Sequence, residues 1–548
     1  MCPRSRRTVP PRARPEYAAR VRTLKLLLLA CGGLAAACAT QPPPADAPLV
    51  TSATPRRPEP FPVAALPVAP PDAPRGPAAP PLLLRGGTVL TAAGRTFERG
   101  HVLMVDGRIA SVGEGPGEAP QGATIVDVSG RFLTPGLIDS HSHMGVYPLP
   151  GSRGNSDGNE VGDPTTAGVW AEHGFWPQDP ALPRAVAGGI TTIQVLPGSA
   201  NLIGGRSFTA KLKLKGSARE MRFPGAPQGL KMACGENPKR VYGDERNGLP
   251  STRMGNVHGY RKAFQDALEY RRRWQKYDRD LELWRQKLLR EEEKAKAPPA
   301  HPAPGATAEA GAKKPDEELG PLDPPDPPAR DLELETLARV LDGGILVHNH
   351  CYRADEMNLM LDLAREFRFK IRSFHHAVEA YKLRDRLASE GVAVSTWVDW
   401  WGFKMESLDG VRENAALVAD AGARAILHSD SESEVRHLNQ EAAKALTAGR
   451  RLGLKLDDNE ALRWITANPA WALGVEEQTG TLTVGKMGDV VVWDRHPFSV
   501  YAHAEQVFID GERVFERGKE RQVTDFELTL PQAGDAALTP PTAKGVKP

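Results

Sequence analysis

The stretch Gly136-Leu-Ile-Asp-Ser-His-Ser-His143 decides how the fold of this chain is interpreted. It continues an apolar run that begins at Phe132 and ends on two histidines one residue apart. In a β-strand, residues i and i+2 point to the same side, so both imidazoles can reach one ion. In α/β barrels, ligands gather at the carboxyl ends of the strands. The stretch therefore predicts a barrel strand that ends at a metal site.

Three further segments repeat this arrangement of an apolar run followed by a ligand. His348 ends the run that starts at Ile345, and His376 ends the run that starts at Ile371. Asp430 follows the run Ala425-Ile-Leu-His-Ser429. A helix cap, a core histidine or a surface residue would explain any one of these positions. Four ligands at successive strand ends favour one shared metal site.

The region from 136 to 470 alternates strand-like runs with helical stretches, which favours a parallel α/β fold, most simply a (β/α)8 barrel. Short β-type runs at 82–135 and 471–525 flank this region, and we expect one small β-sandwich domain built from both chain ends. Within the barrel, residues 258–296 carry apolar side chains at helical spacing amid dense charge. They predict a long amphipathic helix packed on the barrel surface, with a membrane- or partner-docking helix as the alternative.

The 49 prolines are unevenly spread along the 548 residues. Residues 41–81 hold fifteen of them and residues 298–328 hold ten. The remaining chain has about 5% proline, which is ordinary for a globular protein. We therefore expect an extended tether at 38–81, a disordered surface loop at 297–330 inserted in the barrel, and a disordered tail at 526–548.

The first 37 residues carry the basic charge of the chain. They hold eight Lys or Arg against one Glu, so a formal net charge of +2 for the chain becomes −5 for the remainder. That sign disfavours nucleic acid as a partner. Their basic start and the apolar run that ends at Ala37 predict a signal peptide. The ending Leu34-Ala-Ala-Ala-Cys38 resembles a bacterial lipoprotein signal, in which Cys38 would be lipidated; Cys31 is a competing site, and simple secretion is the alternative.

We expect an exported protein in the bacterial cell envelope, held on the periplasmic side of a membrane by a lipid anchor only, or else secreted. Five cysteines are present, and three of them belong to the first 38 residues. Cys234 and Cys351 remain in the body, as one disulfide or as two thiols.

Taken together, the motifs resemble the amidohydrolase superfamily, whose members are metal-dependent hydrolases with a (β/α)8 barrel and a small β-sandwich. The resemblance spans about residues 82–525, and it is nearest to the imidazolonepropionase-like branch in the broad sense. Besides the first-strand signature, it includes the segments Pro197–Gly205, Gly235–Gly243, Arg353–Glu356, Thr466–Ala470 and Gly485–Trp493.

The resemblance implies a ligand set and a cofactor. The metal ligands would be His141 and His143 on the first strand, Lys231 on the fourth as a carboxylated bridge, His348 on the fifth, His376 on the sixth and Asp430 on the eighth. Lys211 and Lys213 rival Lys231, and His350 shares a strand face with His348, so these two histidines could exchange roles. The cofactor would be one or two divalent ions; zinc suits this nitrogen and oxygen set best, and manganese or iron would also fit.

The implied chemistry is hydrolysis of an amide-type C–N bond in a small molecule, with Asp430 as the proton shuttle. Deaminase-type members place a Glu two residues after the fifth-strand His, where this chain has His350, so an amide, an N-acyl amino acid or a dipeptide is favoured over a nucleobase. The alternatives are a deaminase, an imidazolonepropionase-type ring hydrolase, and a silent barrel that only binds. An oligomer is compatible with the sequence.

Substrate contacts are expected from Asn237, Arg240, Tyr242 and His350, with Lys404 and Glu406 as weaker candidates.

Overall fold

The computed structural model describes residues 80–296, 323–400 and 402–519. The predicted signal peptide, Cys38 and the tail 526–548 lie outside the described residues, as do most of the tether and of the loop at 297–330. No described helix is both long enough and apolar enough to cross a membrane.

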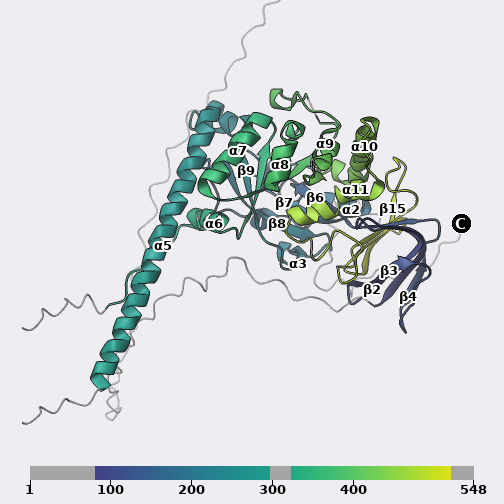
Figure 1. Cartoon of the computed structure of the whole chain (residues 1–548), viewed down its shortest axis with the longest axis horizontal. Coiled ribbons are helices and arrows are strands. Elements are labelled where there is room, and N and C mark those ends of the chain that lie inside the picture. The colour runs from purple at the N-terminus through teal and green to yellow at the C-terminus, as the bar shows by residue number, and fades with distance from the viewer. Residues whose placement is uncertain (1–79, 297–322, 401, 520–548) are drawn as a thin grey trace, which may run out of the picture. The chain divides into compact units, whose positions relative to one another are not determined.

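An eight-stranded sheet forms a nearly closed barrel, in which the strands follow one another in chain order (Figure 1). The backbone N–H of Asp430 donates to the carbonyl of His141 at 3.1 Å, which links the ends of the first and last strands. The strands are β6 (Leu137–Ser142), β7 (Ile190–Val195), β8 (Ile203–Lys211), β9 (Gly229–Ala233), β10 (Leu346–Cys351), β11 (Ile371–His376), β12 (Ala393–Thr396) and β13 (Ala425–Leu427).

The prediction of a strictly parallel (β/α)8 barrel is wrong at one strand. β8 pairs antiparallel with both β7 and β9, while the other neighbouring pairs are parallel. The reason is the short connection at 196–202, because a parallel crossover needs a dozen or more residues. The carboxyl ends of the seven parallel strands still meet at one face of the barrel.

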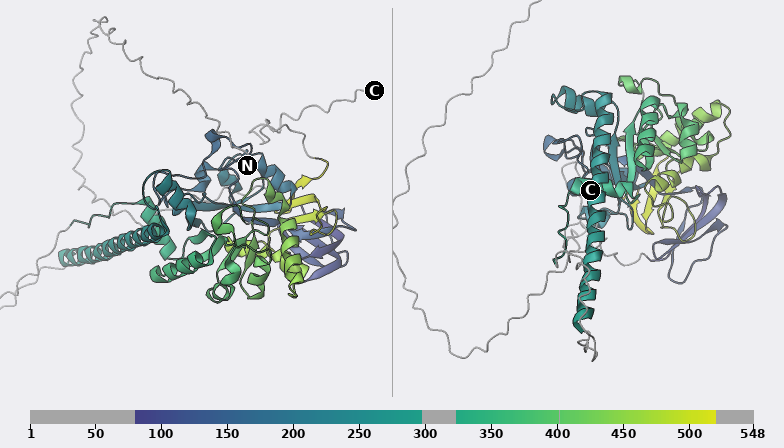
Figure 2. Two further views of the ribbon diagram at one scale, coloured as in Figure 1. Left: turned by 90° about the horizontal axis from the view of Figure 1, so that it is seen from above. Right: turned by 60° about the vertical axis from the view of Figure 1, so that its left-hand side comes forward.

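The second eight-stranded sheet draws strands from both ends of the described chain (Figure 2). Its central junction is an antiparallel pairing of β14 with β5. Its strands are β1 (Leu82–Leu90), β2 (Thr96–Val105), β3 (Arg108–Glu114), β4 (Thr124–Asp127), β5 (Phe132–Pro135), β14 (Val490–Trp493), β15 (Ala504–Ile509) and β16 (Glu512–Glu516). Packing as a two-layer sandwich stays a prediction.

Helices cover the barrel and join its strands. Local capping explains several of their starts: Asp331 accepts two backbone N–H bonds at 3.0 Å at the start of α6, and Asp457 caps α11. The helices are α1 (Ala171–Gly174), α2 (Ala181–Ala187), α3 (Ala218–Met221), α4 (Glu236–Lys239), α5 (Arg253–Lys296), α6 (Leu332–Leu341), α7 (Ala354–Phe367), α8 (Arg384–Glu390), α9 (Asn414–Asp420), α10 (Leu438–Arg451), α11 (Asp458–Arg463) and α12 (Ala467–Ala472).

The long helix α5 is the predicted amphipathic insertion, and it begins five residues before the expected start. Its first turns bury Tyr260 and Phe264 in the barrel core, where Phe264 stacks on Phe369 at 4.5 Å between ring centroids. Tyr270 donates to Glu335 of α6 at 3.2 Å, and Arg261 pairs with Glu366 of α7 at 2.9 Å (Figure 1). These contacts fix the first half of α5 to the barrel.

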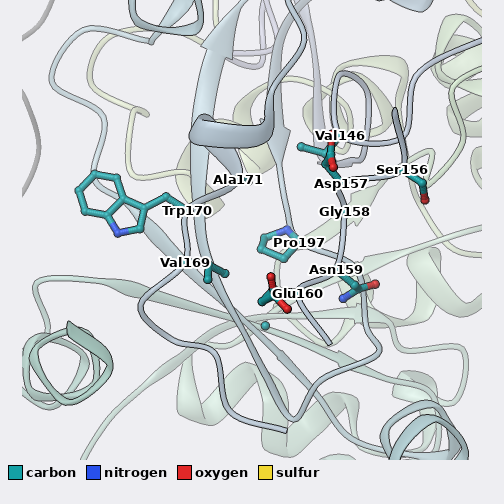
Figure 3. Close-up of a pocket in the computed structure, with 11 residues that line it drawn as sticks. Val146, Ser156, Asp157, Gly158, Asn159, Glu160, Val169, Trp170, Ala171 and Pro197 are labelled. Atoms are coloured by element: carbon teal, nitrogen blue, oxygen red, sulfur yellow. The ribbon is translucent and has the colours of Figure 1, made fainter. Parts of the chain in front are cut away.

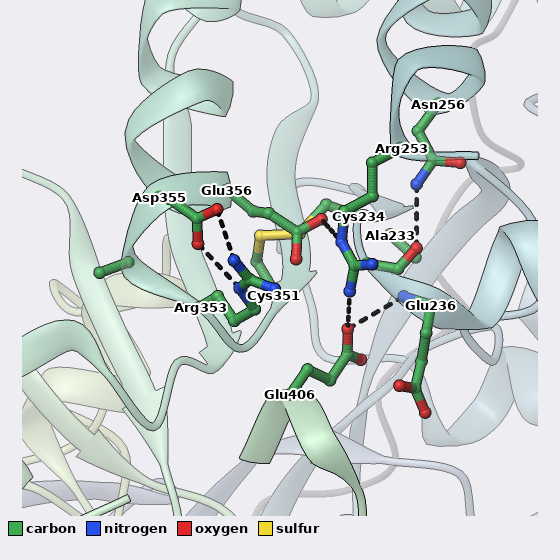
Figure 4. Close-up of a disulfide and its surroundings, with 12 residues drawn as sticks. Ala233, Cys234, Glu236, Arg253, Asn256, Cys351, Arg353, Asp355, Glu356 and Glu406 are labelled. Atoms are coloured by element: carbon green, nitrogen blue, oxygen red, sulfur yellow. Dashed lines mark hydrogen bonds and ion pairs between the residues drawn. A yellow bond between two sulfur atoms is a disulfide. The ribbon is translucent and has the colours of Figure 1, made fainter. Parts of the chain in front are cut away.

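Cys234 and Cys351 form a disulfide, which decides between the two options that the sequence leaves open (Figure 4). Cys234 directly follows Ala233, the last residue of β9, and Cys351 is the last residue of β10. These two strands are parallel neighbours, and the Cα atoms of the cysteines are 5.2 Å apart. The bond closes a segment with a sequence separation of 117 that contains all of α5. It therefore ties the carboxyl end of β9, from which this long insertion leaves, to the carboxyl end of β10, the strand that follows the insertion.

Candidate metal centre

The two histidines of the first strand converge as predicted. His141 and His143 lie with their Nε2 atoms 3.3 Å apart at the carboxyl end of β6. The Nδ1 of His143 lies 2.8 Å from the carbonyl of Leu196, so it carries the proton and donates it. That bond leaves Nε2 of His143 as the free lone pair, which is the arrangement that a metal-ligating imidazole needs.

Asp430 closes the centre from the other edge of the barrel. Its Oδ1 lies 3.2 Å from Nε2 of His143 and 3.5 Å from Nε2 of His141. Its Oδ2 lies 3.9 Å from Nδ1 of His376. Both Asp430 (φ +51°) and His376 (φ +68°) have left-handed backbone conformations. Such conformations cost free energy for residues with a Cβ and cluster at functional sites.

The left-handed turn at His376 changes which way its neighbour points. The sequence predicts that His375 faces away from His376, as in a regular pleat. Instead both rings reach His141, each at 4.8 Å between centroids. The prediction is wrong because the pleat breaks at the last residue of β11.

Lys231 of β9 is buried at 1% exposure, and its Nζ lies 3.2 Å from Nε2 of His141. Burial lowers the pKa of Lys231 to about 7, while Asp430 acts in the opposite sense. Lys231 is therefore the lysine that the structure brings to the centre.

The rival lysines lie elsewhere and are already paired. Lys211 of β8 lies 3.0 Å from Asp489 and also contacts Asp510, which joins the barrel to the second sheet. Lys213 pairs with Glu512 at 2.7 Å. Both lysines thus hold the two sheets together.

His348 and His350 both project from β10, but only His350 lies at the centre. The ring of His350 is 4.4 Å from that of His376, and both of its nitrogens are buried without a hydrogen-bond partner among the described residues. His348 lies one step deeper, with Nδ1 2.9 Å from His375 and Nε2 3.0 Å from Gln194. The structure therefore does not place His348 with the other predicted ligands and favours His350 in its place.

A chain of buried imidazoles extends from His141 into the barrel. Nδ1 of His141 lies 2.9 Å from Nδ1 of His375, and Nε2 of His375 lies 2.9 Å from Nδ1 of His348. The chain ends at the Gln194 amide, which also lies 3.1 Å from Ser207. Gly229 must be glycine here, because a Cβ would lie 2.8 Å from the His348 ring.

If Nε2 of His141 held a metal ion, the direction of this chain would be fixed. Nδ1–H of His141 would then donate to His375, Nε2–H of His375 to His348, and Nε2–H of His348 to an oxygen of Gln194. Rotation of the Gln194 amide by a half-turn exchanges its nitrogen and oxygen and so places the oxygen toward His348. In the other orientation, Oε1 of Gln194 is buried without a partner among the described residues, which agrees with the half-turn. His348 and His375 would then orient His141 rather than bind an ion themselves.

Burial favours the neutral form of four histidines of the centre. It lowers the pKa of His141, His350 and His376 well below the usual value, and it lowers the pKa of His428 to about 3. Burial alone would raise the pKa of Asp430, but the neighbouring imidazole of His143 outweighs that effect, and the pKa of Asp430 lies below its usual value. Neutral imidazoles and an ionised carboxylate are the protonation states that bind metals.

His428 is a member of the centre that the sequence analysis missed. Nitrogens of His141, His376 and His428 lie within 4.8 Å of one another, as do ligand atoms of His141, His143 and Asp430. Nε2 of His428 accepts the backbone N–H of His376 at 3.3 Å. The signal was present in the spacing His428-Ser-Asp430, which repeats the spacing of His141 and His143.

The predicted substrate residues of the strand-four loop are largely engaged with the protein. Arg240 is exposed and paired with Glu245, and Tyr242 is buried with its hydroxyl donating to the carbonyl of Asp163 at 2.6 Å. Asn237 donates to Ser199 at 2.8 Å and accepts from Lys404 at 3.4 Å. The prediction that Arg240 captures a substrate carboxylate therefore finds no support in its contacts.

A cavity of about 210 Å³ is lined by the segments that follow β6 and β7 and by Gly204 of β8 (Figure 3). Its polar side chains are Ser156, Asp157, Asn159 and Glu160, and Trp170 forms part of the opposite wall. None of the predicted metal ligands lines this cavity.

Comparisons with known proteins agree with this geometry. Residues 368–515 match the Amidohydrolase family. The crystal structure of an amidohydrolase from Thermotoga maritima MSB8 is 33% identical; the match covers 80% of this chain and 100% of that one, with a TM-score of 0.65. The chain belongs to the amidohydrolase family.

Two curated relatives match over part of their length. The amidohydrolase tasK of Hapsidospora irregularis is 33% identical over 440 residues, which are 76% of this chain and 39% of that protein. A 5-methylthioadenosine/S-adenosylhomocysteine deaminase of Symbiobacterium thermophilum is 34% identical over 122 residues, 20% of this chain and 27% of that protein. The chain thus spans well under half the length of either relative, so their activities do not by themselves assign its substrate.

Proposed function

We propose that this amidohydrolase family member is a metal-dependent hydrolase of an amide-type C–N bond in a small molecule. The observation that carries the proposal is the convergence of His141, His143 and Asp430 with His376 and Lys231 at the carboxyl face of the barrel. A set of neutral imidazoles around one carboxylate, without other partners for several ring nitrogens, is a donor set for a divalent cation.

The donor set fits one or two divalent ions, of which zinc is the expected one. We assign His141, His143, His350, His376 and Asp430 as ligands. When bound, such ions polarise a substrate carbonyl and lower the pKa of water toward ~7. The site can therefore supply a nucleophile near neutral pH.

Lys231 joins this set as a carbamate. A lysine reacts with carbon dioxide only as the neutral amine, and burial lowers the pKa of Lys231 to about 7, so a large share is neutral at physiological pH. The product is an anion with two oxygens, which replaces an uncompensated cation in a centre that must hold cations. Carboxylation thus resolves the unfavourable burial of this lysine.

Asp430 handles the proton. It is ionised at neutral pH, and its side chain is 23% exposed, so it faces both the ligands and the open side of the centre. It accepts a proton from the attacking water and delivers it to the leaving nitrogen. Its Oδ1 and the free Nε2 of His143, which lie 3.2 Å apart, are two acceptors that a shared cation would hold together.

Deamination remains the second candidate function. With His350 as the fifth-strand ligand, the position two residues later is Tyr352, so the Glu expected for proton transfer to a ring nitrogen is again absent from that position. This difference favours amide hydrolysis, and ammonia release from a nucleobase or another heterocycle would favour the deaminase. An imidazolonepropionase-type ring hydrolase is disfavoured by Lys231.

The test is a metal and activity assay on one preparation. Purified protein loaded with Zn²⁺ should hold at least one ion per chain and hydrolyse a member of a panel of dipeptides, N-acyl amino acids, hydantoins and lactams. Chelation should abolish the activity, and re-addition of metal should restore it. Less than about half an ion per chain, with no effect of the chelator, would support a silent binding barrel instead.

We also propose that the protein is exported and lipid-anchored through Cys38. The disulfide between Cys234 and Cys351 supports an oxidising compartment, since stable disulfides are rare in the cytosol. Fractionation tests the anchor: the native chain should sediment with membranes, and Cys38→Ser should be released in soluble form. Equal distribution of the two would argue against lipidation at Cys38.

A further inference from the structure

Four aromatic rings follow the ends of β10 and β12 and extend from the metal centre toward solvent. Tyr352 and Trp397 stack on His376, at 5.1 and 4.3 Å between ring centroids and with interplanar angles of 20° and 22°. Trp400 stacks on Trp397 at 5.3 Å and 18°. Phe403 contacts Tyr352 and Trp397 edge-on, at 6.2 Å from each. The rings form one contiguous stack that starts at a proposed ligand.

The inner and outer rings differ sharply in exposure. Tyr352 and Trp397 are 3% and 5% exposed, whereas Trp400 and Phe403 are 40% and 57% exposed. Leaving large aromatic side chains in water forgoes the stabilisation that their burial would give. An exposed apolar surface that is continuous with a catalytic centre is best explained by a ligand that covers it.

The residues that follow Phe403 are anchored by a buried carboxylate. Glu406 is 2% exposed. It accepts from Arg253 at 3.1 Å and from the backbone N–H of Glu236 at 3.0 Å (Figure 4). Arg253 also pairs with Glu356 at 3.0 Å. Phe403 thus lies next to an anchored turn, which lowers the entropic cost of binding there.

The charges around the rings decide what kind of group fits there. The Lys404 ammonium lies 3.9 Å from the centre of the Tyr352 ring, but it is paired with Glu406 at 2.8 Å and donates to Asn237. Its charge is therefore matched, and it offers little to a carboxylate. What remains open at the outer end of the stack is ring surface.

We infer that Trp400 and Phe403 form a subsite for an aromatic or other planar apolar group of the substrate, next to the bond that is cleaved. The inference rests on the proposed function for the position of the scissile bond. It narrows the substrate class to amides with such a group on one side of the bond.

Binding to the metal-free protein tests the subsite without any need for activity. The probes are N-acetyl-phenylalaninamide and N-acetyl-alaninamide, which differ only in the aromatic ring. The native chain should bind the first at least about tenfold more tightly, because a phenyl group is buried in one complex and absent from the other. The double variant Trp400→Ala/Phe403→Ala should bind the two probes within about twofold.

The matched control is Met405→Ala/Leu408→Ala. These residues lie on the same segment and are 78% and 61% exposed, but they belong to none of the ring contacts. The control should keep the preference of the native chain. Equal binding of the two probes by the native chain, or the same loss in the control, would overturn the subsite.

Kinetics separate this inference from the proposed function. Within a series of matched amide substrates, kcat/KM should favour the aromatic member by about tenfold or more. The double variant should lose this preference, and the control Met405→Ala/Leu408→Ala should retain it. Hydrolysis without any aromatic preference would refute the subsite and leave the function standing. A probe preference without any hydrolysis would refute the function and leave the subsite standing.

A membrane surface is the competing occupant of the exposed rings. Co-sedimentation with phosphatidylcholine vesicles distinguishes it, with protein truncated at residue 80 so that no lipid anchor contributes. The native chain and the double variant should sediment equally. Loss of vesicle binding in the double variant, with unchanged affinity for both probes, would contradict the subsite.

Discussion

Two lysines are buried on neighbouring strands of the barrel, and their surroundings differ. Lys211 of β8 lies between two carboxylates, Asp489 and Asp510, at the junction with the second sheet. Lys231 of β9 lies among histidines, with His141 at 3.2 Å, and within the described residues it forms no ion pair with a carboxylate. Both side chains are less than 5% exposed. Burial is therefore shared, and the partners distinguish the two sites.

The difference teaches how a buried cation is explained. A buried lysine that is matched by carboxylates holds two parts of a fold together, and removing it leaves an uncompensated charge. A buried lysine without a matched partner is unfavourable unless it changes its chemical state. The pKa of about 7 at Lys231 makes such a change accessible near neutral pH. Lys211 thus has a structural role, and Lys231 has the role that we propose at the metal centre.

The largest expected effect is that of Lys231→Ala on activity. We expect kcat/KM to fall about a thousandfold or more, because the loss of a bridging ligand removes several kcal/mol of transition-state stabilisation by the metal. Short carboxylic acids should restore part of the activity by replacing the carbamate oxygens. Thermal unfolding should change little. Full activity in this variant would contradict the proposed role of Lys231 at the metal centre.

Lys211→Ala should do the reverse. We expect the free energy of unfolding to fall by about 3–5 kcal/mol, since Asp489 would be left buried without its partner. Metal content per folded chain should stay at the native value. Lys213→Ala is the control, because its pair with Glu512 is partly exposed and is worth less than about 1 kcal/mol. Urea unfolding of the three proteins measures these differences.

The two histidines of β10 extend the comparison from stability to ligation. His350→Ala should lower metal affinity far more than His348→Ala, for which a loss of about 10–100-fold is typical of a residue that orients a ligand. Titration with Zn²⁺ against a competing chelator measures both. A larger loss in the His348 variant would return the ligand role to His348.

The smallest expected effect, counted per histidine and per pH unit, is on the pH dependence of stability. Burial lowers the pKa of His348 and His428 to about 3, against about 6.5 in the unfolded chain. The unfolded state then binds more protons, so stability is present above pH 6.5 and is lost as the pH falls toward 3. Each histidine contributes up to about 1.4 kcal/mol per pH unit in that window. Urea unfolding of the metal-free protein at pH 7 and pH 5 measures the slope, and a flat profile would contradict the buried neutral rings.

Much of the fold and of the centre could be predicted from local sequence. In a β-strand, residues i and i+2 point to the same face. The apolar run that ends at His141 and His143 therefore predicts that these residues end a strand and that their two imidazoles converge. The helical spacing within 258–296 likewise predicts α5. These features depend on periodicity, which the sequence contains in full.

The remaining features depend on contacts between distant strands. His348 and His350 share a strand face, and only the register of β10 against β9 and β11 decides which of them is deeper. The break of the pleat at His376 and the reversed direction of β8 depend on backbone turns that the side chains do not signal. The disulfide joins residues far apart in the chain, and parallel pairing alone brings them together.

Metal content tests the central claim, that Lys231 rather than Lys211 completes the metal centre, most directly. Native protein, Lys231→Ala and Lys211→Ala would be loaded with Zn²⁺, desalted and analysed for metal per folded chain. We predict one to two ions in the native protein and in Lys211→Ala, and less than about half an ion in Lys231→Ala. Full metal in Lys231→Ala together with its loss in Lys211→Ala would contradict the account.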